Sequence, residues 1–224
     1  WDTLHTRTEQ AMMILMSLGS MKRVIVRINI QYYTLRGCLG KELKDLTVGV
    51  IGTGRIGRTV IRDLSGFGCR ILAYDLYQSE EVKEHAEYVD LDTLFAQADV
   101  ITLHTPLTEE SHHLINAESM AKMKDGVVIV NTARGPLIDI PAFIEAIENG
   151  KIGAAALDVV ENEFGLYYYD HKSDILKNRD LAILRGFPNV TVSHHMAFYT
   201  DNAIHTMVAD SLMGCKRFMC GEEN

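Results

Sequence analysis

Short apolar runs alternate along this chain with longer stretches in which apolar residues recur every three or four positions. The runs have the length and the β-branched content of strands, and they lie at residues 47–51, 69–74, 100–103, 127–130, 153–157 and 190–192. The stretches between them predict amphipathic helices, among them 91–97, 117–123 and 140–148. Because the runs place apolar residues on both faces, the strands should be covered on both sides. The predicted fold class is therefore α/β, a doubly wound parallel sheet.

The first strand ends in a glycine-rich turn with the pattern GxGxxG, followed at once by a helical pattern. The turn consists of Gly52, Thr53, Gly54, Arg55, Ile56 and Gly57. Its glycines allow a tight turn, a close approach of backbone to a pyrophosphate, and close packing of helix on strand. The turn could also be purely structural, but the strand before it, the helix after it and a spaced acidic residue together favour a Rossmann-like dinucleotide site.

That acidic residue is Asp75, eighteen residues beyond the last glycine and at the end of the second strand. Its carboxylate would bind a ribose diol and repel a 2′-phosphate, and Leu76 and Tyr77 supply no compensating cation. The predicted cofactor is therefore NAD. The residues that follow the strand at 100–103 are expected to edge the adenine pocket, and they are His104, Thr105 and Pro106.

Composition narrows the choice of partners. The 224 residues carry a net charge of −8, which disfavours binding to nucleic acid, and no apolar run approaches the ~18 residues of a membrane span. We therefore expect a cytoplasmic protein with neither a nucleic-acid nor a membrane partner. The four cysteines lack metal-ligand spacing, so no metal site is predicted, and His112 and His113 are interpreted as surface or capping histidines.

Polar residues follow three of the later strands and should converge on one edge of the sheet. They include Arg134 after the strand at 127–130, Asp158 and Glu163 after 153–157, and His195 after 190–192. A hydride-transfer enzyme that acts on a 2-oxo or 2-hydroxy acid needs a cation for the substrate and a group that exchanges a proton. Arg134 and a histidine would supply both.

These motifs resemble the D-isomer-specific 2-hydroxyacid dehydrogenases. The landmarks are GTGRIG, NTARGPLID, ALDVVENE and HHMAFYT, of which AFYT and FGLYYYDHKSDIL resemble the D-lactate and D-2-hydroxyisocaproate branch. The resemblance implies that Arg134 binds the substrate, and that His195 is the acid in reduction and the base in oxidation. It also implies that Glu163 pairs with His195, that Asp158 holds the nicotinamide carboxamide, and that Thr132 and Ala133 line the nicotinamide face.

The resemblance also implies a domain plan. We expect a linking helix and connector at residues 1–40, an NAD-binding domain at 41–195, and a C-terminal helix at 196–224 that returns to a substrate domain. Most of that substrate domain would precede the chain, which begins at Trp1. Family members are commonly homodimers, so a homodimer is expected. The last helix should pack on another layer, and without a covering partner it would expose Met207 and Leu212.

Three questions stay open at this stage. The family usually has proline where His194 stands, and the position of AFYT favours His195 over His194 as the acid–base residue. Phe198 and Tyr199 could shape an apolar pocket for pyruvate or for a branched or aromatic 2-oxo acid, or they could be core residues. The chain could also be an NAD(H)-binding sensor similar to a corepressor, or a non-catalytic truncated remnant.

Overall fold

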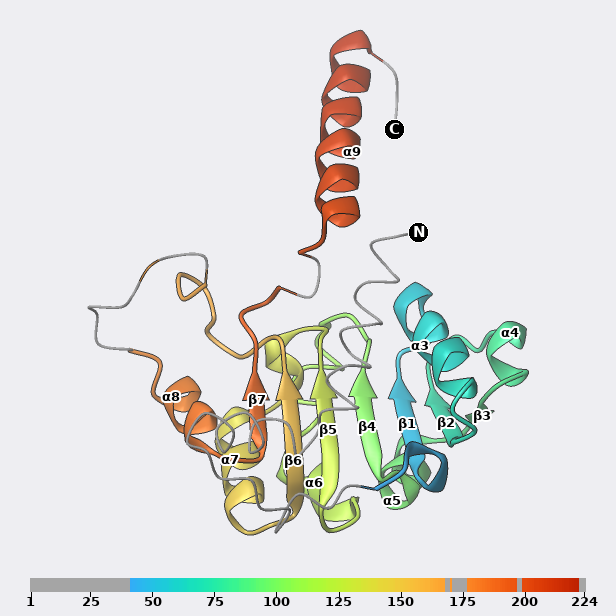
Figure 1. Ribbon diagram of the computed structural model, residues 1–224, viewed down its shortest axis with the longest axis vertical. Helices are drawn as coiled ribbons and strands as arrows, with labels where there is room; N and C mark the ends of the chain where they lie inside the picture. Colours follow the sequence, from blue (N-terminus) through green and yellow to red (C-terminus); the bar gives the residue numbers. More distant parts are fainter. Residues whose placement is uncertain (1–40, 168–169, 171–176, 197–198, 222–224) are drawn as a thin grey trace, which may run out of the picture.

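The computed structural model describes residues 41–167, 170, 177–196 and 199–221. Within these residues seven strands form one sheet, in the order β3-β2-β1-β4-β5-β6-β7, and every neighbouring pair is parallel (Figure 1). The strands are β1 (Thr47–Ile51), β2 (Arg70–Tyr74), β3 (Glu87–Tyr88), β4 (Val100–Leu103), β5 (Val127–Asn131), β6 (Ile152–Leu157) and β7 (Val190–Val192). The predicted fold class is confirmed. The linking helix and connector predicted at residues 1–40 lie outside the described residues.

The strand directions gather the candidate site at one edge. Because all neighbouring strands run parallel, the arrowheads in Figure 1 point the same way, and the loops after β1, β4, β5, β6 and β7 open at the same edge of the sheet. In open α/β sheets this carboxyl edge is where ligands bind. The glycine turn and the polar segments named above all follow these strands.

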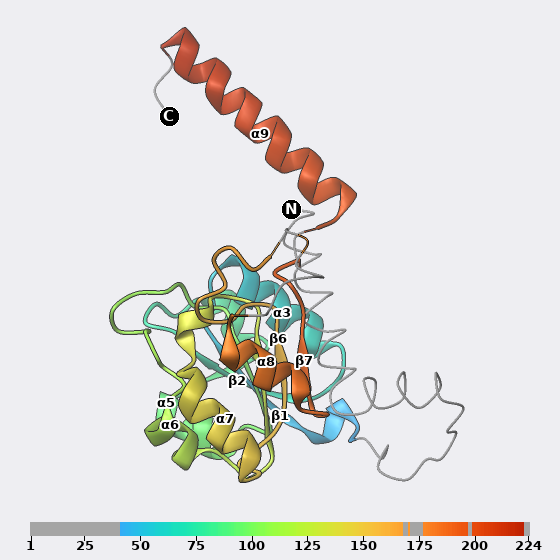
Figure 2. The same ribbon diagram turned by 90° about the vertical axis from the view of Figure 1, so that its left-hand side faces the viewer.

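The last helix, α9 (Asp201–Cys220), projects away from the sheet (Figures 1 and 2). Its N-cap is Thr200, whose side chain accepts a hydrogen bond from the Ala203 amide, and Ala203 is its one buried residue. The described residues leave most of this helix uncovered, since Met207 is 50% exposed and Leu212 is 66% exposed, and its packing on a substrate domain stays a prediction. The expected exposure of those two side chains is confirmed. None of the helices in the described ranges is long and apolar enough to cross a bilayer.

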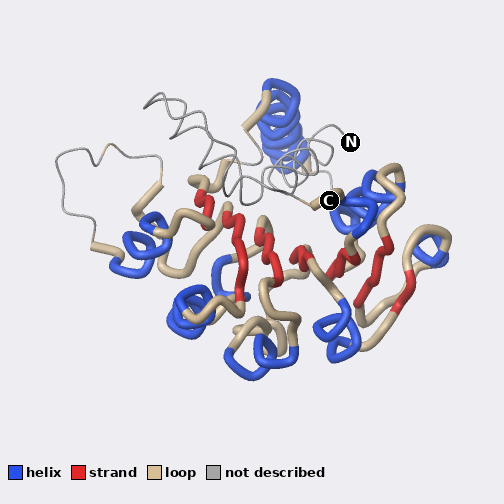
Figure 3. Tube along the Cα trace, turned by 60° about the horizontal axis from the view of Figure 1, so that its bottom comes forward, coloured by secondary structure: helices blue, strands red, loops and turns tan. Residues whose placement is uncertain are grey.

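The other helices cover the sheet on both faces (Figure 3). They are α3 (Arg55–Ser65), α4 (Glu80–Lys83), α5 (Leu91–Gln97), α6 (Ala117–Lys122), α7 (Ile140–Glu148) and α8 (Arg179–Gly186), and two short 3-10 helices, η1 (Leu43–Asp45) and η2 (Gly135–Leu137), accompany them. Residues of α3 and α4 form one hydrophobic cluster with the sheet, and residues of α5, α6, α7 and α8 form a second, larger cluster. The sheet therefore lies between two cores.

Strand β1 shows why the apolar pattern is continuous. Val48 and Val50 belong to the cluster under α3, whereas Ile51 points to the opposite cluster, so both faces of the strand need apolar side chains. Gly49 faces α5, and a Cβ atom there would lie 2.6 Å from the side chain of Leu94. The missing side chain at Gly49 is thus what lets α5 pack close to the sheet.

Phe143 on α7 is fully buried in the larger cluster, and its removal should test that core. We expect Phe143→Ala to lower the free energy of unfolding by about 3–5 kcal/mol, because it removes buried apolar surface and leaves a cavity. Phe67, which is 37% exposed, offers the matched control, and Phe67→Ala should cost less than half as much. Urea denaturation of both variants measures the difference, and equal losses would contradict this account of the core.

Candidate active site

The glycine turn between β1 and α3 is built by close backbone contacts. Gly52 has a φ of +93°, which L side chains rarely adopt, and a Cβ atom there would lie 2.6 Å from the His104 carbonyl carbon. A Cβ atom on Gly57 would overlap the carbonyl oxygen of Gly52. Gly54, in contrast, has open space where its Cβ would stand. The turn therefore leaves room beside the N-terminus of an eleven-residue helix, whose free amides and partial positive charge suit a pyrophosphate.

Asp75 lies beside this turn, directly after β2. Its Oδ2 accepts hydrogen bonds from the Thr53 amide at 2.6 Å and from the Thr53 hydroxyl at 3.1 Å, and its Oδ1 accepts one from the Tyr77 amide at 2.9 Å. These bonds fix the carboxylate, yet a carboxylate has about four acceptor sites, so capacity remains for a ribose diol. The residues present thus fit a dinucleotide that lacks a 2′-phosphate.

His104 closes the other side of the turn. Its amide donates to the Ile51 carbonyl at 2.7 Å, and its Nε2 lies 2.9 Å from the Thr102 hydroxyl, which is fully buried. Burial lowers the pKa of His104 from the ordinary 6.5 to about 4, because a charged imidazole would lose its hydration there. His104 is therefore neutral near pH 7. Thr105 is partly exposed, and Pro106 is exposed at the same edge.

The end of β5 presents Arg134. Asn131, which is fully buried, accepts a hydrogen bond from the Ala133 amide and donates one to the Arg134 carbonyl at 2.8 Å, so the segment through Thr132 forms a tight turn. The Arg134 residue is exposed, and its guanidinium donates to the Ala133 carbonyl at 2.6 Å. Gly135 follows, where a Cβ atom would overlap the Val160 carbonyl. The loops after β5 and β6 are thus in direct contact.

Asp158, directly after β6, joins three strand ends. Its amide donates to the Asn131 carbonyl at 2.9 Å, and its own carbonyl accepts from the His195 amide at 2.9 Å. Asp158 is 2% exposed. Its carboxylate accepts a hydrogen bond from the Ser193 hydroxyl at 2.6 Å and another from the Met196 amide at 3.1 Å. Asp158 therefore positions the segment that carries His195.

His195 and Glu163 lie together although they are 32 positions apart in the sequence. The Nδ1 atom of His195 is 2.9 Å from Oε1 of Glu163, and Oε2 of Glu163 accepts a hydrogen bond from the Val160 amide at 3.0 Å. The two side chains are 32% and 26% exposed, so the pair is partly sheltered and still reachable. His195 has a φ of +54°, and this left-handed backbone turns its ring toward Glu163. The arrangement is a proton-exchanging imidazole held by a carboxylate.

The neighbouring His194 is placed differently. It is an exposed residue, and its ring centroid lies 6.5 Å from that of Tyr167. Tyr199 is 63% exposed, so it is not a core residue, and Phe198 lies outside the described residues. The pairing with Glu163 thus distinguishes His195 from His194.

Two contacts near the site were not predicted from the sequence. Thr53 is buried, and its hydroxyl lies 2.7 Å from that of Tyr88, so it links the glycine turn to both Asp75 and β3. The position of Thr53 inside the glycine motif was the one feature of the sequence that could have indicated these contacts. His112 is exposed, as expected of a surface histidine, whereas His113 is partly exposed and its Nε2 lies 2.8 Å from Oε1 of Glu161, a contact that was not predicted. Nothing in the spacing of these two residues indicates that contact.

Comparison with known families identifies the domain. The sequence model of the D-isomer-specific 2-hydroxyacid dehydrogenase NAD-binding domain matches residues 11–197. The chain belongs to this family. Its matched domain type confirms the prediction of a Rossmann-like NAD-binding domain.

Several relatives support the same assignment. An aromatic 2-oxoacid reductase of Clostridium sporogenes is 48% identical over 193 residues, which cover 86% of this chain and 58% of the relative. A D-specific alpha-keto acid dehydrogenase of Enterococcus faecium is 40% identical over 95% of this chain and 65% of its own length. The crystal structure of a D-lactate dehydrogenase from Aquifex aeolicus, complexed with NAD and lactic acid, is 35% identical with a TM-score of 0.91, over 98% of this chain and 67% of that one. The chain thus spans about three fifths of the length of the curated relatives that it matches.

The Asp75 carboxylate should set the cofactor preference. We expect Asp75→Asn to weaken NADH binding and to relieve the repulsion of NADPH. The ratio of NADH affinity to NADPH affinity should therefore fall about 10-fold, which corresponds to a change of roughly 1.4 kcal/mol in relative binding free energy. Fluorescence titration with both nucleotides measures the ratio. Asp92→Asn, which removes a carboxylate paired with Lys122 on the helices α5 and α6, should leave it unchanged. An unaltered ratio in Asp75→Asn would contradict the assigned contact.

The lowered pKa of His104 predicts a stability change with pH. Between pH 6.5 and about 4 the unfolded chain binds a proton at this residue and the folded chain does not, so stability falls as the pH falls through this window. Part of the residue still reaches solvent, which reduces the effect. Between pH 7 and pH 4.5 we expect the parent to lose on the order of 1–2 kcal/mol more of its free energy of unfolding than His104→Gln loses. Urea denaturation at pH 7 and pH 4.5 measures it. The exposed His85 offers the control, and His85→Gln should keep the parent's pH dependence.

Proposed function

We propose that this chain carries the cofactor site and the acid–base pair of an NAD-dependent enzyme that interconverts a 2-oxo acid and a D-2-hydroxy acid. The observation that carries the proposal is the 2.9 Å contact between His195 Nδ1 and Glu163 Oε1, at the sheet edge where the glycine turn also opens. When bound, NADH supplies a hydride to the carbonyl carbon of the 2-oxo acid, while the carbonyl oxygen takes a proton to give the alcohol.

His195 is the proposed proton donor in reduction and the proton acceptor in oxidation. An ionised carboxylate only accepts hydrogen bonds, so the Nδ1 atom facing Glu163 carries a proton. Nε2 is then the nitrogen that we assign to proton exchange with the substrate oxygen. Glu163 is a positioning residue in this account, because its other oxygen is held by the Val160 amide and it fixes the orientation of the ring.

Arg134 is the proposed substrate-binding cation. A planar guanidinium donates two parallel hydrogen bonds to a carboxylate, which is the group shared by all 2-oxo acids. The exposed position of Arg134 after β5, where the buried Asn131 donates to its carbonyl, supports this role. Asp158, Thr132 and Ala133 remain the proposed contacts of the nicotinamide.

The side chain of the substrate is part of the proposal. The names of the relatives favour pyruvate, a branched 2-oxo acid or an aromatic one, since they include a D-lactate dehydrogenase, a D-2-hydroxyisocaproate dehydrogenase and an aromatic 2-oxoacid reductase. The exposed Tyr199 is available to line such a pocket. We also retain the proposals of a homodimer and of a cytoplasmic location. The three cysteines among the described residues are free thiols, which supports a reducing compartment.

The acid–base assignment predicts a contrast between two adjacent residues. His195→Ala should lower kcat for 2-oxo acid reduction by about 10²–10⁴-fold, the usual contribution of a positioned acid or base. The exposed His194 provides the matched control, and His194→Ala should change kcat by less than about 3-fold. NADH oxidation by the purified chain, followed by absorbance with pyruvate, 2-oxoisocaproate and phenylpyruvate, measures both variants.

Parallel NADH titrations separate the alternatives. A large loss in His195→Ala with unchanged NADH affinity supports the proposal and identifies the loss as one of chemistry. Saturable NADH binding by the parent chain without turnover is also expected of a cofactor domain that spans about three fifths of its relatives, so only NADH-dependent assembly of the chain would then favour the sensor hypothesis. Absence of both binding and turnover would leave the remnant hypothesis.

A further inference from the structure

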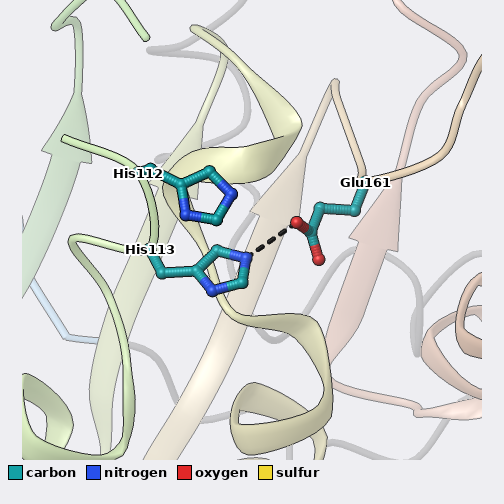
Figure 4. Close-up of side chains that lie close together, drawn as sticks. All are labelled: His112, His113 and Glu161. Carbon is teal, nitrogen blue, oxygen red and sulfur yellow. Dashed lines mark hydrogen bonds and ion pairs between the residues drawn. The ribbon is translucent and has the colours of Figure 1, made fainter. Parts of the chain in front are cut away.

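Two consecutive histidines and a glutamate meet outside the residues assigned to catalysis. His112 and His113 lie in the segment between β4 and α6, and Glu161 lies in the loop after β6 (Figure 4). One ligand atom from each of the three lies within 4.8 Å of the other two. Figure 4 shows both imidazole rings on the side of the segment that faces Glu161. The proposed mechanism uses none of them.

The backbone explains how adjacent histidines come to share one side. His113 has a φ of +51°, a left-handed conformation that turns its side chain back toward that of His112. The two rings stack with centroids 3.9 Å apart and an interplanar angle of 25°. Hydrogen bonds from the His112 amide to the Thr108 carbonyl and from the His113 amide to the Pro136 carbonyl hold this turn. The backbone that presents the two imidazoles is therefore held in place, while their side chains can still rotate.

Glu161 faces the rings from an equally constrained loop. Its carbonyl accepts a hydrogen bond from the Asn178 side chain at 3.3 Å, and its amide lies so near Gly135 that a Cβ atom there would approach to 2.7 Å. Its side chain is 21% exposed, and that of His113 is 33% exposed. The carboxylate is thus presented to the histidines in a partly sheltered position that small ions can enter.

Two imidazole nitrogens and one carboxylate oxygen are a ligand set that zinc-class ions favour. A tetrahedral ion with bonds of about 2.0–2.1 Å holds its ligand atoms roughly 3.4 Å apart. The 2.8 Å between His113 Nε2 and Glu161 Oε1 would open by about 0.6 Å, and no other pair of ligand atoms would need to close by more than about 1.4 Å. Side-chain rotations on these loops cover both changes.

We propose that His112, His113 and Glu161 bind a divalent transition-metal ion of the zinc class, with water completing its coordination. The site goes beyond the proposed dehydrogenase function and does not depend on it. Its position gives it a structural consequence, because Glu161 precedes Glu163 by two residues. A bound ion would join the segment after β4 to the loop that carries the proposed positioning residue of the acid–base pair.

Calorimetric titration with zinc chloride tests the site directly. Thiols also bind zinc, so the parent for this test carries Cys38→Ser, Cys215→Ser and Cys220→Ser, the last two being exposed cysteines. We expect saturable binding of one ion per chain. His112→Ala and Glu161→Gln should each weaken it by at least about 10-fold, since loss of even an outer-shell partner costs that much. His113→Asn should also weaken zinc binding by at least about 10-fold, and asparagine is chosen because it tolerates the positive φ at this position.

Exposed histidines elsewhere provide the controls. His85→Ala and His205→Ala should bind zinc as the parent does. The thermal midpoint of each variant without metal shows whether it is folded, and Glu161→Gln keeps a hydrogen-bonding side chain if His112→Ala proves unstable. Parent-like binding in folded His112→Ala and Glu161→Gln would overturn the proposal. So would loss of binding in His195→Ala alone, because the ion would then occupy the acid–base pair.

Discussion

The candidate site depends on one buried carboxylate, that of Asp158. A buried carboxylate is costly unless its oxygens are hydrogen-bonded, and here the Ser193 hydroxyl and the Met196 amide bond it on either side of His195. The backbone of the same residue bonds to Asn131 at the end of β5 and to His195 beyond β7. Three strand ends are thereby fixed around one charge. The left-handed φ of His195, a conformation unfavourable for a residue with a Cβ, persists because these bonds surround it.

The sequence predicted the fold wherever burial alone decides the structure. Strands β1, β4 and β7 have the predicted bounds. Almost every residue of β1 and β4 is buried, whereas β7 lies at the edge of the sheet and was detected from its β-branched residues. Strand β3, only Glu87–Tyr88, was not predicted, since two residues pairing with the edge of β2 leave no period to detect. The behaviour of α9 could not be derived either. Its apolar pattern predicts that one face of the helix is covered, but it does not say which part of the protein covers that face.

The candidate site divides in the same way. The glycine turn and Asp75 follow from spacing, because each glycine answers a local steric demand that the structure shows at Gly52 and Gly57. The roles of Glu163 and His195 came from resemblance to a family, and only the coordinates bring the two side chains to 2.9 Å. The contact between His113 and Glu161 escaped prediction because it joins residues 48 positions apart through a left-handed residue. No periodicity in the sequence encodes such a meeting.

One loop therefore bears on two different chemistries. The segment after β6 begins at the bonded Asp158, passes over Gly135 where no side chain would fit, and then presents Glu161 and Glu163 in turn. Its two glutamates contact imidazoles on different elements, His113 after β4 and His195 after β7. Only one residue, Asn162, itself at a φ of +57°, separates the two glutamates, so an ion bound at Glu161 would act on the same short stretch of backbone that carries Glu163. Because this loop is short, the ion proposed to bind Glu161 would lie close in sequence to Glu163, and the ion-binding proposal therefore bears on the acid–base pair.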